Sequence, residues 1–368
     1  MEIFEDGEQE VGTRFENEGF EGRISLNRAT TGDWSGVYGL QWSDTEFSAV
    51  GEEAFIPATD IAALGFFGLE RYTGARFSAE LGLRVENNEV DATAGCDFDG
   101  TSTSVSGSLL YDLDGDSNIL FGLSRSERAP SVEELFSNVA TSTCAEEADP
   151  EDLVLHAATG LLEIGDPGLD TETANNIELG FRRHRGNVTG ELSVYYNQIS
   201  DYIFLDLTGE EFEEQPIARY LTRDATFSGV EGKVLFHLLE SGGNGLDLGV
   251  FGDLVDAKFD AGGDIPRIPP AKLGVELRYF GPNWSTHLHA TRVFDQDDTA
   301  ELELATDGYS LLSFYADYHW ALSASSELKL FVKGENLLDE EIRNHASFLK
   351  HFAPEPGRGF KVGLRFEY

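Results

Sequence analysis

The sequence predicts an all-β protein, a transmembrane antiparallel β-barrel in which residues 1–368 form a single, partial barrel domain. Three observations predict this fold. Apolar and polar residues alternate over about ten residues at a time. Short turns and long acidic connections follow one another along the chain. The last expected strand ends, without a tail, on the aromatic residue Tyr368.

The alternation gives each expected strand one apolar face and one polar face. Over residues 75–86, one face carries Phe77, Ala79, Leu81, Leu83 and Val85, and the other carries Arg76, Ser78, Glu80, Arg84 and Glu86. The same arrangement recurs over residues 188–198 and 271–279. Because the strands of a soluble sandwich also alternate, the connections decide between the two folds.

The connections differ in length in a regular way. Short turns are expected near residues 31–32, 73–74, 115–116, 186–187, 242–243, 281–282 and 323–324, and longer connections over 138–173, 208–223, 295–308 and 337–358. Tight turns on one rim and long loops on the other are typical of barrels in the outer membrane of Gram-negative bacteria. This rhythm predicts about fifteen strands, plus a possible remnant before Val11.

Composition excludes several classes of protein. The longest apolar stretch, Ile61–Leu69, is far shorter than the roughly 20 residues that a membrane helix needs. The net charge of −41 repels nucleic acid, so no nucleic-acid partner is expected. This acidity could concentrate cations or could simply solvate the surface. The segment Met1–Asp6 lacks the basic and apolar regions of a signal peptide, so we expect upstream residues to be missing.

The C-terminal residues form the most specific local pattern. Phe360, Val362, Leu364, Phe366 and Tyr368 alternate with polar residues and Gly363. The ending Gly363, Phe366, Tyr368 resembles the terminal strand of outer-membrane proteins, which the barrel-assembly machinery recognises. An ordinary edge strand is the alternative.

Six segments, in order, resemble TonB-dependent receptors: Ser126–Ser137 with its Arg-Ala-Pro-Ser-x-x-Glu-Leu-Phe pattern, Asn175–Phe181, Val194–Ile203, Phe227–Glu231, Ile268–Pro270 and Asn336–Asp339. The resemblance implies the later part of a roughly 22-stranded barrel whose N-terminal plug, TonB box and first strands are missing. It implies import of a scarce nutrient across the outer membrane. It also implies contact with membrane lipid and lipopolysaccharide, and with the TonB system through the plug.

Two further segments, 155–167 and 343–358, resemble the subgroup that contains zinc-uptake receptors. This resemblance implies zinc or another metal species as the transported substrate, with no tightly bound cofactor. The competing hypotheses are a passive outer-membrane pore and an adhesin-like surface barrel. No sequence signature of a catalytic site is present, so an enzyme is not expected.

Imidazole and carboxylate groups are the natural zinc ligands where thiolates are scarce. His156 is the first candidate, in a long acidic loop that includes Glu146, Glu147 and Glu163. The alternative is a loop histidine without a partner. A second candidate group in the last loop comprises His345, His351, Glu340 and Glu341. The spacing of its histidines fits neither one strand face nor one helix face, so a shared site there would depend on loop folding.

His287 and His289 are two residues apart on an expected strand and therefore share its lumen face. Asp317 and His319 face the same way on the next strand, and we place all four near the periplasmic rim. This polar cluster could pass an ion along the lumen, or it could be polar lining that is hydrogen-bonded to a plug.

Cys96 and Cys144 fall in consecutive expected extracellular loops. The cell exterior is oxidising, so a disulfide is expected, with two buried free thiols as the alternative. Trp34, Trp42, Trp284 and Trp320 come near expected strand ends, as in an interfacial girdle, although a soluble core would also bury tryptophan.

Overall fold

A computed structural model of the chain describes residues 2–5, 8–11, 13–51, 54–93, 95–139, 144, 149–323 and 325–368. The strands are β1 Glu2–Glu5, β2 Glu8–Val11, β3 Arg14–Thr31, β4 Trp34–Val50, β5 Thr59–Thr73, β6 Phe77–Ala92, β7 Cys96–Asp112, β8 Ser117–Arg128, β9 Leu162–Ile164, β10 Glu172–Arg183, β11 Val188–Phe212, β12 Gln215–Ser241, β13 Asn244–Phe259, β14 Lys272–Phe280, β15 Trp284–Val293, β16 Tyr309–Ala321, β17 Glu327–Glu335 and β18 Gly359–Glu367. Helix α1 (Val132–Phe136) and the 3-10 turn η1 (Pro150–Asp152) lie between β8 and β9.

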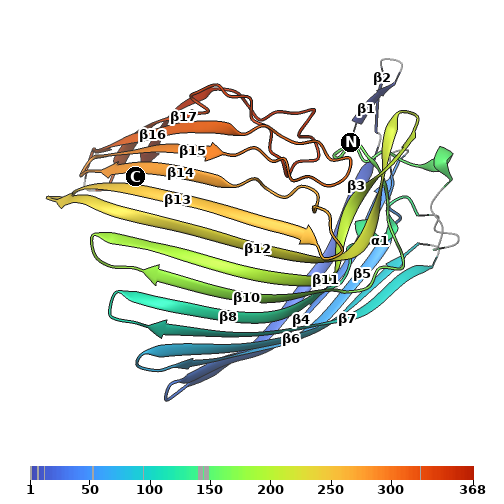
Figure 1. Ribbon diagram of the computed structural model, residues 1–368, viewed down its shortest axis with the longest axis horizontal. Helices are drawn as coiled ribbons and strands as arrows, with labels where there is room; N and C mark the ends of the chain where they lie inside the picture. The colour runs from blue at the N-terminus through green and yellow to red at the C-terminus, as the bar shows by residue number, and fades with distance from the viewer. Residues whose placement is uncertain are drawn as a thin grey trace.

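Within the described residues, one 16-stranded sheet forms most of the molecule (Figure 1). Strand β9 lies off its main path, which leaves fifteen strands from β3 to β18 paired antiparallel in chain order, as expected. The ladder curves into a barrel wall, and β3 and β18 form its two ends. Its concave side is called the lumen face here. Strands β1 and β2 pair separately, where the remnant before Val11 was expected.

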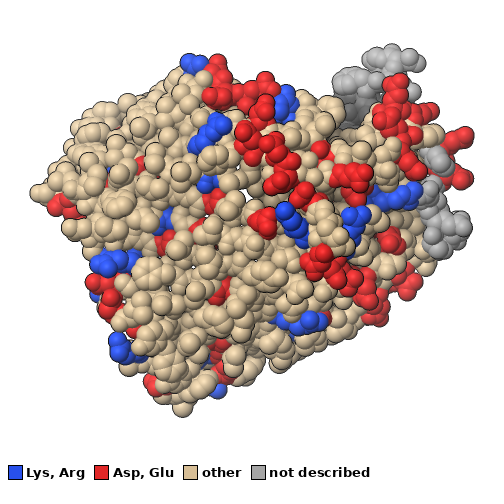
Figure 2. Space-filling model, viewed as in Figure 1, with Lys and Arg blue, Asp and Glu red and all other residues tan. Residues whose placement is uncertain are grey.

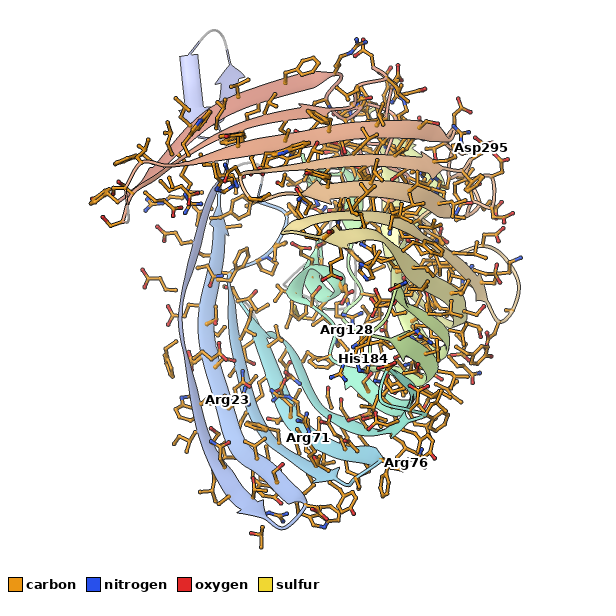
Figure 3. All side chains as sticks on the ribbon, turned by 90° about the vertical axis from the view of Figure 1, so that its left-hand side faces the viewer. Arg23, Arg71, Arg76, Arg128, His184 and Asp295 are labelled. Atoms are coloured by element: carbon orange, nitrogen blue, oxygen red, sulfur yellow. A yellow bond between two sulfur atoms is a disulfide. The ribbon has the colours of Figure 1, made fainter. Side chains whose placement is uncertain are left out.

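The two faces of the wall carry different side chains, and the sticks in Figure 3 project from both. In β14, Leu273 is 52% exposed and Val275 47% exposed on the outer face, whereas Glu276 on the lumen face is only 3% exposed. The apolar residues on the outer face are not covered by any other described part of the protein. This is expected for contact with lipid and not for packing against a second sheet or a layer of helices. The alternation in the sequence is therefore the alternation of a membrane barrel.

All the long connections lie on one rim, and the other rim holds only short turns. The turn rim holds the connections at 32–33, 74–76, 113–116, 184–187, 242–243, 281–283 and 322–326, and the loop rim holds 51–58, 93–95, 129–171, 213–214, 260–271, 294–308 and 336–358. Three of the four long connections expected from the sequence lie on the loop rim. The exception is 208–223, which is mostly strand.

The expectation of a loop at 208–223 is wrong because β11 and β12 continue past their neighbours as a long hairpin. Leu207 pairs with Ala218, and Phe212 pairs with Gln215. Glu213 and Glu214 alone make the turn, with φ values of 49° and 69°. Two successive positive φ values are typical of the two-residue turn that matches strand twist. Strand β9 pairs in parallel with β12 over residues 217–219, close to the tip of the hairpin.

The connection between β8 and β10 folds inward and packs on the lumen face. Ser131 caps α1 and forms a capping box with Glu134, which explains the Pro-Ser-x-x-Glu spacing in the sequence. Leu135 and Phe136 of α1 are buried in a cluster with Val90 of β6 and Cys96 of β7. The loop rim is thus partly covered by a packed element, which Figure 3 shows in the space enclosed by the curved wall.

The disulfide expected from the sequence is present. Cys96, the first residue of β7, is bonded to Cys144 in the connection between β8 and β10, across 48 residues of sequence. Cys96 is 1% exposed and packs in the same cluster as α1. The bridge therefore holds the inward-folded connection to the barrel wall.

Aromatic rings gather on the outer face near the turn rim. The pairs are Trp34 with Tyr72, Tyr279 with Trp284, Tyr318 with Trp320 and Phe366 with Tyr368. Amphipathic rings prefer the membrane interface, so these pairs mark the level of the lipid headgroups. Trp42 differs from the expectation because it lies in the middle of β4, opposite Gly22 of β3.

The charged surface and the apolar surface are separated along the strands. Figure 2 shows acidic residues crowded toward the loop rim, at the right of the view, and few charges across the strands at the left. No helix in the described part of the chain is long and apolar enough to cross a membrane.

Candidate functional site

The lumen face of β14 and β15 carries a cluster of ligand-type side chains. Glu276 pairs directly with His289 across the two strands, and His287 lies diagonally beside it. One donor atom from each of these three residues lies within 4.8 Å of the other two. Among the described residues, this is the group of three His, Cys, Asp or Glu side chains whose positions suit a metal ion.

Cations also contact this cluster, which we call the wall triad. Lys233 Nζ lies 2.7 Å from Glu276 Oε1, and Arg278 Nη2 lies 2.9 Å from Glu276 Oε2. His287 Nε2 lies 3.2 Å from the same Oε2 atom. Because Glu276 is buried, its negative charge is stabilised by these partners, which offset the cost of removing the carboxylate from water.

His289 is held by neighbours on both sides. Its Nε2 atom lies 2.9 Å from the Thr291 hydroxyl, and its ring stacks on Phe251 with centroids 4.9 Å apart. The ring therefore has a fixed orientation, and Nδ1 is the nitrogen left for another partner. Glu276 was not among the expected site residues, although counting back from the turn at 281–283 would have placed it opposite His289.

Asp317 and His319 form a separate cluster, closer to the turn rim. His319 uses Nε2 toward Asp317, at 2.6 Å, and Nδ1 toward Glu327. Asp317 also accepts a hydrogen bond from Ser285, at 2.7 Å. The four residues expected to form one polar cluster are therefore divided between two clusters. The pair His287 and His289 lies mid-strand, and only Asp317 and His319 lie near the turn rim.

His156 lies in the connection between β8 and β10 and contacts one of its expected neighbours. Its Nδ1 atom is 3.0 Å from Glu163 Oε1, and Glu163 is only 1% exposed. Thr159 donates to the same carboxylate at 2.5 Å, and Tyr220 of β12 donates at 3.2 Å. Glu146 and Glu147, the other carboxylates named for this site, lie outside the described residues. The role of His156 as a metal ligand stays a prediction.

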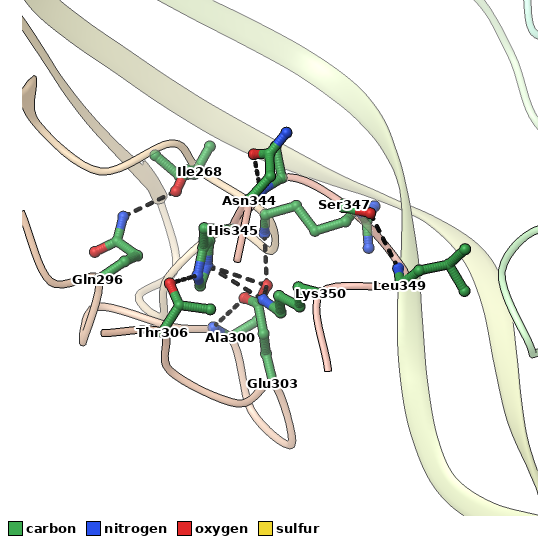
Figure 4. Close-up of polar contacts among 12 residues, drawn as sticks. Ile268, Gln296, Ala300, Glu303, Thr306, Asn344, His345, Ser347, Leu349 and Lys350 are labelled. Carbon is green, nitrogen blue, oxygen red and sulfur yellow. Dashed lines mark hydrogen bonds and ion pairs between the residues drawn. The ribbon is translucent and has the colours of Figure 1, made fainter. Parts of the chain in front are cut away.

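His345 is buried beneath the last two loops (Figure 4), with 1% of its surface exposed. Its Nδ1 atom lies 2.9 Å from the Thr306 hydroxyl, and its Nε2 atom lies 3.3 Å from Glu303 Oε1. Lys350 Nζ donates to the same Glu303 oxygen at 2.6 Å. Both imidazole nitrogens thus have partners within the loops. Glu303 and Lys350 were not anticipated from the sequence.

The electrostatics of this buried group favour an ionised carboxylate. Burial opposes the ionisation of Glu303, but hydrogen bonds from His345 and Lys350 outweigh it and lower the pKa of this carboxyl to about 2. The group therefore ties the connection 294–308 to the connection 336–358 at all but very acidic pH.

The other candidates in the last loop are at the surface. His351 is exposed, and desolvation, followed by the charges of Lys350 and Arg343, lowers its pKa, so its imidazole is neutral at pH 7. Glu341 pairs with Arg343 at 2.7 Å. Glu340 engages Asn336 through backbone atoms. The carboxylate that meets His345 is thus Glu303, not Glu340 or Glu341, and metal binding by these residues stays a prediction.

At the C-terminus, Gly363, Phe366 and Tyr368 lie in or directly after β18, the edge strand of the wall. Phe366 is 56% exposed and Tyr368 is 97% exposed on the outer face. Their role in assembly stays a prediction, and exposed rings on an end strand are accessible to a partner.

Comparison with known proteins gives a consistent result. Residues 4–337 match the family described as TonB dependent receptor-like, beta-barrel. Among solved structures, the chain is similar to the copper transporter OprC, with a TM-score of 0.76 and 18% identity over 97% of this chain and 57% of that one. It is also similar to the FrpB iron transporter from Neisseria meningitidis, with a TM-score of 0.69 and 15% identity over 96% of this chain and 55% of that one.

A third similar structure is the ferric enterobactin receptor PfeA from Pseudomonas aeruginosa, with a TM-score of 0.64 and 16% identity over 96% of this chain and 54% of that one. At these identities the likeness concerns the fold. The chain spans just over half the length of these structures.

Proposed function

The chain belongs to the TonB-dependent receptor-like β-barrel family, and from this premise we propose that it forms the wall of a transporter that imports a metal species. Barrels of this family lie in the outer membrane of Gram-negative bacteria and are not enzymes. The proposed mechanism is capture on the extracellular side, followed by energy-coupled release into the lumen. The loop rim is accordingly the extracellular side, and the turn rim is periplasmic.

One observation carries the proposal: a packed element folds inward over a polar lumen face. The connection 129–171 buries Leu135 and Phe136 against the wall and is bonded to it through Cys96 and Cys144. A passive pore needs an open entrance, whereas a receptor that binds its substrate needs polar side chains held in fixed positions at the entrance. The His156–Glu163 and His345–Glu303 pairs supply such side chains.

Zinc is the cargo that we propose to test first. The segments around His156 and His345 resemble zinc-uptake receptors, and imidazole with carboxylate is a ligand set that zinc accepts. The similar structures OprC and FrpB are described as copper and iron transporters, which supports a metal species in general. For His345 to bind an ion, Lys350 would have to leave Glu303, so capture there would be coupled to loop movement.

The partners follow from the same proposal. The outer face would contact lipid and lipopolysaccharide, and coupling to the TonB system would pass through a plug domain. Gly363 of the last strand and the exposed rings of Phe366 and Tyr368 would be recognised by the barrel-assembly machinery.

Calorimetry on the refolded full-length receptor tests the cargo. We expect zinc binding with micromolar or tighter affinity that weakens in His156→Ala and His345→Ala variants. Binding that is equally tight in both variants would remove these residues from the site. Open ion conductance without saturable metal binding would favour a passive pore. Partner binding that persists in the presence of chelators, without metal uptake, would favour an adhesin.

A further inference from the structure

The wall triad of Glu276, His287 and His289 lies away from the loop residues on which the proposed capture depends. It lies in the middle of β14 and β15, where strand pairing fixes the backbone, whereas His156 and His345 lie in connections. A site in the wall would therefore act after an ion has passed the loops.

We propose that Glu276, His287 and His289 bind a divalent transition-metal ion such as Zn²⁺ on the lumen face, and that Lys233 competes with this ion for Glu276. The inference deepens the proposed function, on which its meaning for transport rests. Binding of the ion by the wall does not depend on transport.

The ligand chemistry supports the site. Two neutral imidazoles and one carboxylate form a ligand set found in open zinc sites, where a water molecule completes the coordination. Tetrahedral zinc holds its ligand atoms roughly 3.3 Å apart. The three donor atoms lie within 4.8 Å of one another, so side-chain rotations bring them to the ion while the strands stay in place.

Neighbouring side chains that would not bind the ion themselves hold the ligand side chains in a fixed orientation, as metal sites require. The hydroxyl of Thr291 holds Nε2 of His289 at 2.9 Å, and Phe251 stacks on the same ring. Rigid strands and fixed rings keep the site assembled without an ion. Glu276 is 3% exposed, so its carboxylate cannot turn to solvent instead.

The cations beside Glu276 set how strongly an ion is held. Lys233 at 2.7 Å and Arg278 at 2.9 Å occupy its two oxygens and repel a dication. An arriving ion must displace the Lys233 ammonium, which returns when the ion leaves. The arrangement therefore favours brief occupancy over permanent binding, as transfer along a lumen requires.

The neighbouring cluster lacks this geometry. His319 directs its two ring nitrogens at Asp317 and Glu327, so the two carboxylates lie on different sides of one imidazole. Because the two nitrogens point in different directions, a single ion cannot bind His319 together with both Asp317 and Glu327. The wall triad instead offers two imidazoles to one carboxylate.

The test is calorimetric titration of Zn²⁺ into the full chain refolded in detergent, compared among four proteins. The double variant His287→Gln/His289→Gln should bind at the wall at least about tenfold more weakly than the parent. Lys233→Met should bind about tenfold more tightly, because a competing charge is removed while the stem is kept. His237→Gln is the matched control, since His237 also pairs with a carboxylate, Asp247, but lies outside the triad.

An unchanged Zn²⁺ affinity in the double variant would overturn the site, and an unchanged affinity in Lys233→Met would overturn the competition. If the double variant does not fold, the single variant His289→Gln tests the same point, with the circular dichroism spectrum as the check on folding. If the full receptor imports no metal although the wall triad still binds Zn²⁺, the proposed cargo is refuted and the metal site is not.

Discussion

Removal of the disulfide gives a prediction whose size follows from the fold. We consider the double variant Cys96→Ala/Cys144→Ala, since alanine leaves no polar atom at the buried Cys96 position. For unfolding of the whole barrel, a closed loop of 48 residues corresponds to about 4 kcal/mol of lost stability in the chain-entropy account. For local opening of the connection alone, the closed segment runs only from the end of β8 at Arg128 to Cys144, about 16 residues, which corresponds to about 3 kcal/mol.

Limited proteolysis measures the free energy of local opening of this connection. The connection 129–171 contains no lysine or arginine but several glutamates, including Glu133 and Glu163, so a glutamate-specific protease is the suitable probe. A difference of about 3 kcal/mol corresponds to an opening equilibrium more than about a hundredfold larger. We expect cleavage in this connection to accelerate accordingly in the variant and in the reduced parent. Equal cleavage rates for the oxidised parent, the reduced parent and the variant would refute the reasoning.

Two further predictions concern the loops and the wall. Lys350→Met should lower the free energy of unfolding at pH 7 by about 2 kcal/mol, because Glu303 loses a buried charged partner. The carboxyl with a pKa of about 2 stabilises the fold above its ordinary pKa, and this stability is lost as pH falls toward 2. Denaturant titrations at several pH values should thus show a smaller loss on acidification in the variant, and an equal loss would contradict the assignment. Leu277→Arg, on the lipid face at mid-strand, should cost about 2–4 kcal/mol, whereas Ser313→Arg on the lumen face should cost far less. Equal effects in denaturant titrations would contradict the assignment of faces.

The strands and their faces were predictable from the sequence because a barrel wall obeys a local rule. Each residue is exposed to lipid or to the lumen according to its position along the strand, so a period of two is visible over ten residues. The failure at 208–223 has an equally local cause. Gly209, with a φ of 79°, and the glutamates near the tip are typical of a loop. Pairing of Leu207 with Ala218 and of Glu211 with Pro216, on the two sides of a register shift at Gly209, outweighs their low strand propensity.

The candidate sites were predictable only where the same rule applies. His287 and His289 share a face by spacing, and the turn at 281–283 fixes Glu276 opposite His289. The loop histidines follow no such rule. His345 meets Glu303 and Thr306 from a different connection, about forty residues away, and not the nearby Glu340 and Glu341. Such partners are chosen by packing between loops, which the spacing of residues in one loop does not encode.

This difference bears on how the barrel could divide its work. A site built from loops can be rearranged more easily, because the contact of His345 with Glu303 is made by side chains from two connections and not by strand pairing. A site built on paired strands keeps its geometry, because any shift of His289 relative to Glu276 would break the ladder between β14 and β15. A transporter needs both properties, one after the other along its path: an entrance that can open and close around the transported ion, and then a fixed site to which the ion is passed. In the proposed transporter, the loop clusters would provide the first of these properties and the wall triad the second.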